Sequence, residues 1–207
     1  MMIDRLNQFL RRAPAWPLYV LAPLPIAWLY YQGLTGALGV DPVKKIEHQL
    51  GLWALWLLIA GLAVTPLMRF AGLKLLKFRR AIGVISFGYV LAHLLTWLVL
   101  DVQFLNVWKD IVKRPYITIG MLAFTLMIPL AATSNNWSLR KLGALTWRRL
   151  HKLTYAVCVL GALHFVMLVK GFQIEPILYM LVILGLLALR VVPKRRRPAS
   201  TPNMAAG

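Results

Sequence analysis

Two stretches of this 207-residue sequence decide its fold, and both follow the same plan. Residues 79–93 read RRAIGVISFGYVLAH, and residues 147–164 read WRRLHKLTYAVCVLGALH. Each begins with basic residues, continues through an apolar run without charge and reaches a histidine. Apolar runs with positive charge at one end are typical of helices that cross a lipid bilayer. The two stretches therefore predict two membrane helices that run in the same direction, each with a histidine inside.

Four further apolar runs flank and separate these two. A run of about 20 residues suffices to cross the roughly 30 Å hydrocarbon core of a membrane. The six expected spans are 13–34, 49–68, 81–100, 115–139, 153–169 and 171–192. The composition agrees, because only 14% of the residues are charged, against about 25% in a soluble domain. We expect an all-α integral membrane protein with six transmembrane helices in one bundle over residues 13–192.

The charged residues predict the orientation of this bundle. Of the 24 Lys and Arg residues, 18 lie in one set of segments: 1–12, 69–80, 140–152 and 190–207. The remaining six share the other loops with five of the six acidic residues. By the positive-inside rule, the basic segments, and with them both chain ends, are cytoplasmic. This placement accounts for the net charge of +18 without nucleic acid as a partner, and the basic face can attract anionic membrane lipid.

Local signals refine the picture at a few positions. Asp41 followed by Pro42 is a helix N-cap with proline in the first turn, so we expect the second helix to begin there. Four prolines interrupt the first span, and the carbonyl groups that they free need other partners. The basic residues 193–207 are expected to form a disordered cytoplasmic tail. The only cysteine, Cys158, excludes an intramolecular disulfide framework and a cysteine-based metal site.

Histidines inside membrane helices are costly and suggest function. His93 lies 13 residues beyond Arg80, and His164 lies 13 residues beyond His151, or about 20 Å along each helix. Both should therefore reach the same depth in the outer half of the membrane, where two imidazoles can bind one haem iron from opposite faces. We expect small residues, Gly83 and Gly88 beside His93 and Gly161 and Ala162 beside His164, to admit the flat ring.

His151, at the cytoplasmic end, is a weaker candidate. On the 81–100 span only Arg79 and Arg80 share its depth, so a second haem bound there would need an unusual sixth ligand or an open site. On an ideal helix His151 and His164 would also point about 140° apart. His151 is thus a possible ligand of an inner haem, a neighbour of a flavin or quinone, or an interfacial histidine. His48 is expected to be structural or to lie near a partner surface.

Other functions fit the same pattern of helices and histidines. In a six-helix carrier or channel without haem, the intramembrane histidines would relay protons. In a membrane anchor for a partner complex, all four histidines would be replaceable. A bound haem distinguishes the electron carrier from both.

The motifs resemble those of a known family. Arg79-Arg80-Ala81-Ile82-Gly83 with His93, and Trp147 to Tyr155 with His164, are similar to two helices of the ferric-reductase-like transmembrane family. A further motif, Gly39-Val40-Asp41-Pro42 followed by Ile46, His48 and Gly51, brings the resemblance closer to the members that serve as haem-binding membrane subunits of bacterial methionine sulfoxide reductase systems. It covers residues 10–192.

The resemblance implies a function, cofactors and ligands. It implies an electron-transfer subunit of the bacterial inner membrane, not the catalytic subunit, which passes electrons from the quinone pool to a periplasmic molybdopterin enzyme that repairs oxidised proteins. It also implies haem b, one or two per chain, and FMN. The family's haem ligands correspond to His93, His151 and His164. Residues 193–207 are too few for a nucleotide-binding flavin domain, so we expect electrons from quinol or from a separate cytoplasmic flavin reductase.

Overall fold

Helices make up the whole ordered framework in the computed structural model, which describes residues 2–104, 107–169 and 171–191. Within these ranges there is no strand. The helices are α1 (Met2–Arg12), α2 (Trp16–Leu21), α3 (Pro23–Leu34), α4 (Pro42–Phe70), η1 (Leu76–Phe78), α5 (Arg79–Thr96), η2 (Trp97–Asp101), α6 (Val107–Lys113), α7 (Pro115–Ala132), α8 (Asn136–Leu150), α9 (Leu153–Leu168) and α10 (Ile174–Val191). The all-α prediction is confirmed, and the predicted tail, 193–207, lies outside the described residues.

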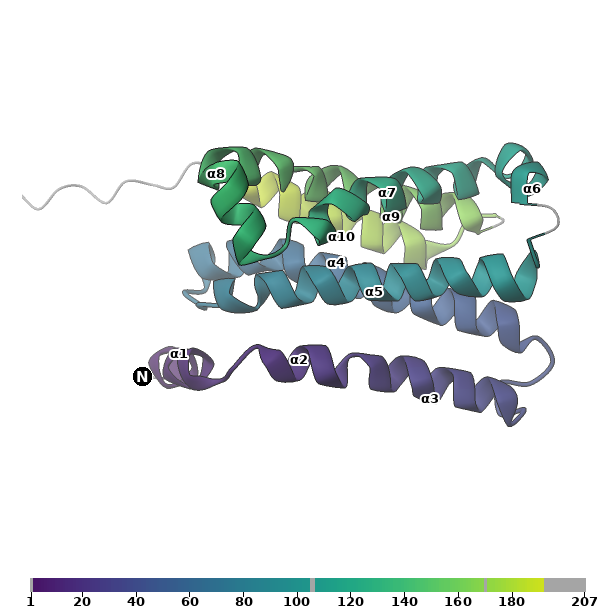
Figure 1. Cartoon of the computed structure of the whole chain (residues 1–207), viewed down its shortest axis with the longest axis horizontal. Coiled ribbons are helices and arrows are strands. Elements are labelled where there is room, and N and C mark those ends of the chain that lie inside the picture. Colours follow the sequence, from purple (N-terminus) through teal and green to yellow (C-terminus); the bar gives the residue numbers. More distant parts are fainter. Residues whose placement is uncertain (1, 105–106, 170, 192–207) are drawn as a thin grey trace, which may run out of the picture.

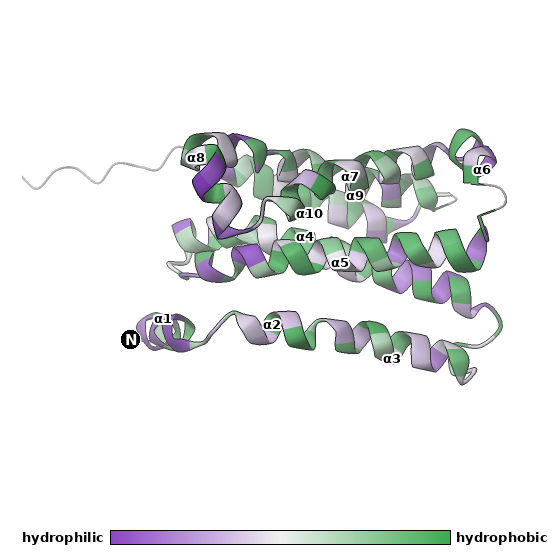
Figure 2. Cartoon of the chain, viewed as in Figure 1, coloured by the Kyte–Doolittle hydropathy of each residue, from purple (hydrophilic) through white to green (hydrophobic). Residues whose placement is uncertain are grey.

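The long helices lie side by side and alternate in direction (Figure 1). One end of the bundle carries the arginine pairs at residues 11–12, 79–80 and 148–149, and we call it the arginine end. The opposite end carries the connection between α3 and α4 and the segments 101–104 and 107–114, and we call it the loop end. Figure 2 shows hydrophilic residues gathered on α1 and α8 at the arginine end, with hydrophobic residues along the middle of the bundle. The sequence-based separation of charge from apolar spans is therefore visible in the fold.

Three helical stretches in the described part of the chain are individually long and apolar enough to cross a membrane. They are Pro42–Phe70, Leu76–Asp101 and Pro115–Ala132. The pair Asn136–Leu150 and Leu153–Leu168, bent by 44°, can provide a fourth. Length and composition thus support an integral membrane protein but give three or four spans, where the sequence predicted six. The first predicted span is split at Pro23, and α9 by itself has only 16 residues. The sixth predicted span, 171–192, ends outside the described residues.

The segment predicted as a cytoplasmic loop, 140–152, is largely helical. Helix α7 ends at Ala132, seven residues before the predicted end of its span, and α8 begins at Asn136, after three intervening residues. Asn135 stabilises this start, because its side-chain oxygen accepts a hydrogen bond from the amide of Ser138 at 2.7 Å. Gly143, at φ 75° and ψ 151°, kinks α8, a backbone conformation that suits glycine.

The start of α4 confirms the predicted N-cap. The Asp41 side chain accepts a hydrogen bond from the amide of Lys44 at 3.2 Å, and Pro42 occupies the first turn. The Lys44 side chain also contacts the Asp41 carboxylate at 2.6 Å. These hydrogen bonds from Lys44 hold the pKa of the Asp41 carboxyl below its ordinary value. The cap fixes the point from which α4 runs about 40 Å toward the arginine end.

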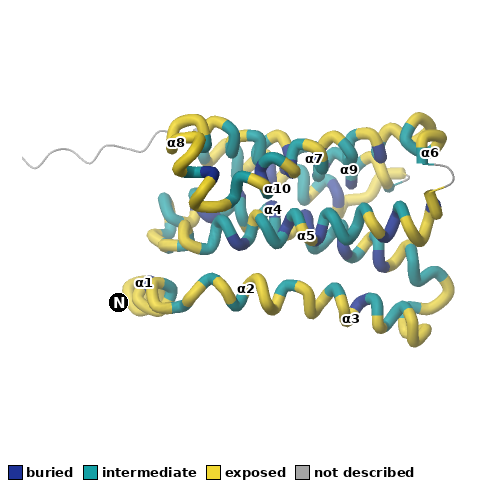
Figure 3. The backbone as a smooth tube through the Cα atoms, viewed as in Figure 1, coloured by how far each residue is buried: buried dark blue, intermediate teal, exposed yellow. Residues whose placement is uncertain are grey.

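Buried residues lie mainly on α4, α5, α7 and α9, whereas α1, α2 and α3 are largely exposed (Figure 3). The largest core cluster joins α4, α7, α9 and α10. The broken α2–α3 segment is held to α5 by two polar contacts. Tyr89 donates its hydroxyl to the carbonyl of Ala22 at 2.8 Å, and the hydroxyls of Tyr30 and Thr96 are 2.6 Å apart. Pro17 has no amide hydrogen for the Ala13 carbonyl, and the Lys77 side chain donates to that carbonyl instead.

Arg190, counted among the cytoplasmic charges in the sequence, directs its guanidinium into the bundle. It donates to the carbonyl of Leu62 at 2.5 Å and to the hydroxyl of Tyr155 at 2.9 Å. In a regular helix the Leu62 carbonyl would accept from the amide of residue 66. Residue 66 is proline and has no amide hydrogen. Arg190 therefore supplies the donor that Pro66 removes from α4.

We expect Arg190→Met to destabilise the protein by about 1–3 kcal/mol, because it leaves the Leu62 carbonyl without its donor. In a Pro66→Ala background the amide of residue 66 can donate to the Leu62 carbonyl, so Arg190→Met should lower the free energy of unfolding by a smaller amount. Unfolding by denaturing detergent of the four proteins of this double-mutant cycle measures the difference. Equal costs in both backgrounds would show that Arg190 does not compensate for Pro66.

Candidate functional site

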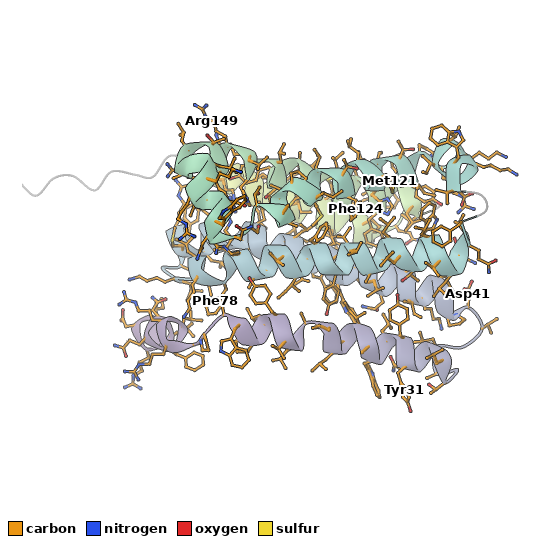
Figure 4. The ribbon with its side chains drawn as sticks, viewed as in Figure 1. Tyr31, Asp41, Phe78, Met121, Phe124 and Arg149 are labelled. Atoms are coloured by element: carbon orange, nitrogen blue, oxygen red, sulfur yellow. The ribbon has the colours of Figure 1, made fainter. Side chains whose placement is uncertain are left out.

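A cavity of about 410 Å³ lies among α4, α5, α7 and α9, toward the loop end. Most of its wall is apolar, and its polar residues include three of the four histidines, His48, His93 and His164. Figure 4 labels Met121 and Phe124 on α7, both of which line the cavity. The Phe124 ring stacks on Phe87 of α5, with ring centres 5.7 Å apart.

The structure brings His93 of α5 and His164 of α9 together in this cavity. Their ring centres are 6.2 Å apart, and the ring planes are at 83° to each other. The two helices begin at the arginine end and run in the same direction, as the sequence predicted (Figure 1). Equal spacing from the arginine end therefore places the two rings at one level of the bundle.

Each ring is oriented by a backbone carbonyl of a neighbouring helix. The Nδ1 of His93 is 2.8 Å from the carbonyl oxygen of Glu47 on α4, and the Nδ1 of His164 is 2.7 Å from that of Tyr116 on α7. A carbonyl only accepts, so in each ring Nδ1 carries the hydrogen and donates it. The neutral ring then has its lone pair on Nε2, which is the form that binds metals.

The distance between the rings suits two axial ligands of one haem iron. A metal–imidazole bond of about 2 Å puts each ring centre about 3 Å from the metal, so two ligands on opposite sides have centres about 6 Å apart. In the described part of the chain, no group of three or more His, Cys, Asp or Glu residues is arranged to hold a bare metal ion. Two imidazoles are sufficient when a porphyrin supplies the other four nitrogen ligands. The donor set therefore fits a haem iron with two axial ligands.

The glycines nearest the rings are not those expected from the sequence. The predicted Gly83 and Gly88 do not line the cavity, and a Cβ built on either would meet nothing within 4 Å. Gly161 does line it, whereas Ala162 is fully buried in the core. Gly51 of α4, which the sequence offered only as part of a family motif, and Gly120 of α7 were not predicted to lie beside the rings. Each lies four residues after the residue whose carbonyl contacts a histidine ring. This spacing can be recognised only once it is known which helices pack against each other.

His151 lies away from this cavity, in the turn between α8 and α9 at the arginine end. Its Nε2 is 3.1 Å from the hydroxyl of Thr133, and its ring stacks on Trp147 with ring centres 3.8 Å apart. Burial lowers the pKa of the His151 imidazole, and the positive charges of Arg79 and Arg80 lower it further. Because α9 begins only at Leu153, the predicted angle of 140° between His151 and His164 does not apply.

Charged residues of both signs line the cavity at the loop end. Lys44, Glu47, Asp101 and Arg114 all contribute to its wall. Within the part of the chain that the structure describes, a carboxylate oxygen of Glu47 is buried without a hydrogen-bond partner. Arg114 pairs with Asp110 at 3.4 Å. The wall thus changes from apolar in the bundle to charged where the cavity approaches the loop end.

The chain was compared with protein families and with curated proteins. Residues 50–162 match the model described as "Ferric reductase like transmembrane component". The matched segment contains His93, His151 and Gly120, and it ends two residues before His164. The chain belongs to the ferric-reductase-like transmembrane family.

Relatives within this family carry a more specific name. Proteins from Brucella anthropi, Brucella ovis and Brucella melitensis are each 48% identical over 194 residues, which cover 91% of this chain and 87% of the relative. Each is named "Protein-methionine-sulfoxide reductase heme-binding subunit MsrQ". No solved structure matches the chain at a significant level.

Proposed function

We propose that this chain is the transmembrane electron-transfer subunit of a methionine sulfoxide reductase system, with one haem b bound between His93 and His164. One observation carries the proposal. Two imidazoles line one cavity, with ring centres 6.2 Å apart and each Nδ1 within hydrogen-bond distance of a helix carbonyl. The name of the MsrQ relatives supports haem as the ligand and the reductase system as the context.

The protein's own residues position and insulate the redox group. When bound, haem b supplies a carrier for single electrons. Apolar residues from four helices make up most of the cavity wall, and such burial tunes the reduction potential together with the axial ligands. Glu47 and Tyr116 fix the tautomer and the direction of the ligand rings through their carbonyls. These residues make the chain a carrier of electrons, with the bond-making chemistry left to a partner.

The proposed electron route follows from the charges. With the arginine end in the cytoplasm, the cavity lies near the periplasmic face. Electrons would then leave toward a periplasmic, MsrP-like molybdopterin subunit that reduces methionine sulfoxide in oxidised proteins. Quinol of the bacterial inner membrane is the proposed donor, with a separate cytoplasmic flavin reductase as the alternative. FMN, implied by the family resemblance, would need a site other than the haem cavity.

We expect the purified protein to show a low-spin b-type spectrum when oxidised and when reduced with dithionite. His93→Ala and His164→Ala should each abolish the low-spin form and lower haem retention by at least roughly 10-fold, because each removes an axial ligand. His48→Ala is the matched control, since His48 lines the same cavity but its ring packs on Phe165.

The spectra also distinguish the competing functions. Protein that remains colourless after expression with ample haem would favour the carrier or the anchor. A His93→Ala protein with an unchanged spectrum and haem content would show that His93 is not a ligand.

His151→Ala should leave the low-spin spectrum of the His93–His164 site intact, because His151 lies at the arginine end and does not line the cavity. The haem-to-protein ratio of the two proteins tests its own role. A fall from two haems to one would assign His151 to an inner haem, and a constant ratio of one would assign it to the contacts with Thr133 and Trp147. Loss of the low-spin form in folded His151→Ala protein would contradict the separation of the sites.

A further inference from the structure

The two histidines are held in the same way by two different helix pairs. His93 of α5 donates to the carbonyl of Glu47 on α4, and Gly51 follows four residues later. His164 of α9 donates to the carbonyl of Tyr116 on α7, and Gly120 follows four residues later. The two helix segments that accept the histidine hydrogen bonds thus share one arrangement, although the sequence shows no repeat.

The spacing of four residues has a structural reason. In an α-helix the carbonyl of one residue points at the amide of the fourth residue onward. A side chain on that fourth residue stands beside the carbonyl and limits access from outside the helix. Glycine leaves this side open, so the carbonyl can accept a second hydrogen bond from an imidazole. Glu47 with Gly51, and Tyr116 with Gly120, have the arrangement that such a shared carbonyl needs.

The contacts around the helical glycines distinguish these two from others. A Cβ on Gly120 would lie 2.8 Å from Nδ1 and 3.0 Å from Cε1 of His164. A Cβ on Gly51 would lie 3.3 Å from the same two atoms of His93. On Gly88 of α5 or Gly185 of α10 it would meet nothing within 4 Å. Both sets of contacts include Nδ1, the atom that lies against the carbonyl, so a methyl group would push the ring away from its acceptor.

We propose that Gly51 and Gly120 are positioning residues of the haem site, which seat the two axial imidazoles against helix carbonyls and hold their planes nearly perpendicular. The inference rests on the proposed function, in which His93 and His164 bind one iron. The measured angle between the ring planes is 83°. Neither glycine touches the iron in this arrangement; each acts through the hydrogen bond of one histidine.

The angle between the rings gives a spectroscopic signature. In oxidised low-spin haem, perpendicular axial imidazoles leave two iron orbitals nearly equal in energy, and the electron paramagnetic resonance (EPR) signal is then highly anisotropic, with one feature at very low field. Parallel imidazoles separate these orbitals and give a rhombic signal with three resolved features. The seating of the rings therefore predicts the highly anisotropic signal for the unmodified protein.

The test compares four alanine substitutions, Gly120→Ala, Gly51→Ala, Gly88→Ala and Gly185→Ala, in the full-length holoprotein. All four introduce the same methyl group into a helix, so a general gain in helix propensity is matched. EPR of the oxidised protein, haem content and midpoint potential are measured for each. We expect Gly120→Ala to lower haem retention on the order of 10-fold and to move the EPR signal toward the rhombic type.

The size of the effect should follow the contacts. Gly51→Ala, with the longer contact, should retain haem but shift the EPR signal and the potential by a smaller amount. Gly88→Ala and Gly185→Ala should resemble the unmodified protein in all three measurements. If Gly120→Ala fails to fold, the milder Gly51→Ala against Gly88→Ala still decides the question.

The outcomes separate this inference from the proposed function. A highly anisotropic low-spin signal that is unchanged in Gly51→Ala and Gly120→Ala would overturn the role of the glycines and leave the haem site intact. Equal shifts in all four variants would also overturn it, because they would show a general effect of alanine. Protein without bis-imidazole haem would overturn both proposals together.

Discussion

A backbone carbonyl inside an apolar bundle must find a hydrogen-bond donor, and the fold of this chain depends on how its few polar side chains meet that need. Arg190 donates to the Leu62 carbonyl that Pro66 leaves without an amide. Tyr89 donates to Ala22 beside the break between α2 and α3. The histidines donate to carbonyls that lie in regular helix, so these bonds orient the rings, whereas the bond from Arg190 replaces a missing backbone donor. Hydrogen bonds from side chains to helix carbonyls thus stabilise the fold and also orient the histidines of the candidate site.

Several features follow from the sequence because they depend on local spacing. Thirteen residues separate Arg80 from His93 and also His151 from His164, and a helical rise converts equal spacing into equal depth. The N-cap at Asp41 is equally local and is confirmed. Charge placement separates the two ends of the bundle before any contact is known. Composition and spacing are sufficient to predict these features, because the thickness of the bilayer sets the length and the apolar character of a membrane helix.

The features that the sequence did not reveal depend on contacts between distant segments. The acceptor of His93 is 46 residues away and that of His164 is 48 residues away. Nothing in the local pattern distinguishes Gly51 and Gly120 from Gly83 and Gly88, which the sequence favoured because they share a helix with a ligand. The extent of α8 was missed for a related reason. Its basic residues indicated a loop, but Asn135 and the kink at Gly143 let the same residues continue as helix.

The candidate site and the hydrophobic core of the bundle share residues. Leu55, Met127, Val157 and Phe165 belong to the largest buried cluster and also line the cavity. Since each imidazole bonds to a carbonyl of a different helix, a change in the packing of α4 on α5, or of α7 on α9, moves a ring relative to its partner. Interiors are close-packed and transmit such displacements instead of absorbing them. The geometry of the ligand pair is therefore determined by helix packing, and substitutions in the apolar core can alter the redox site without touching a histidine.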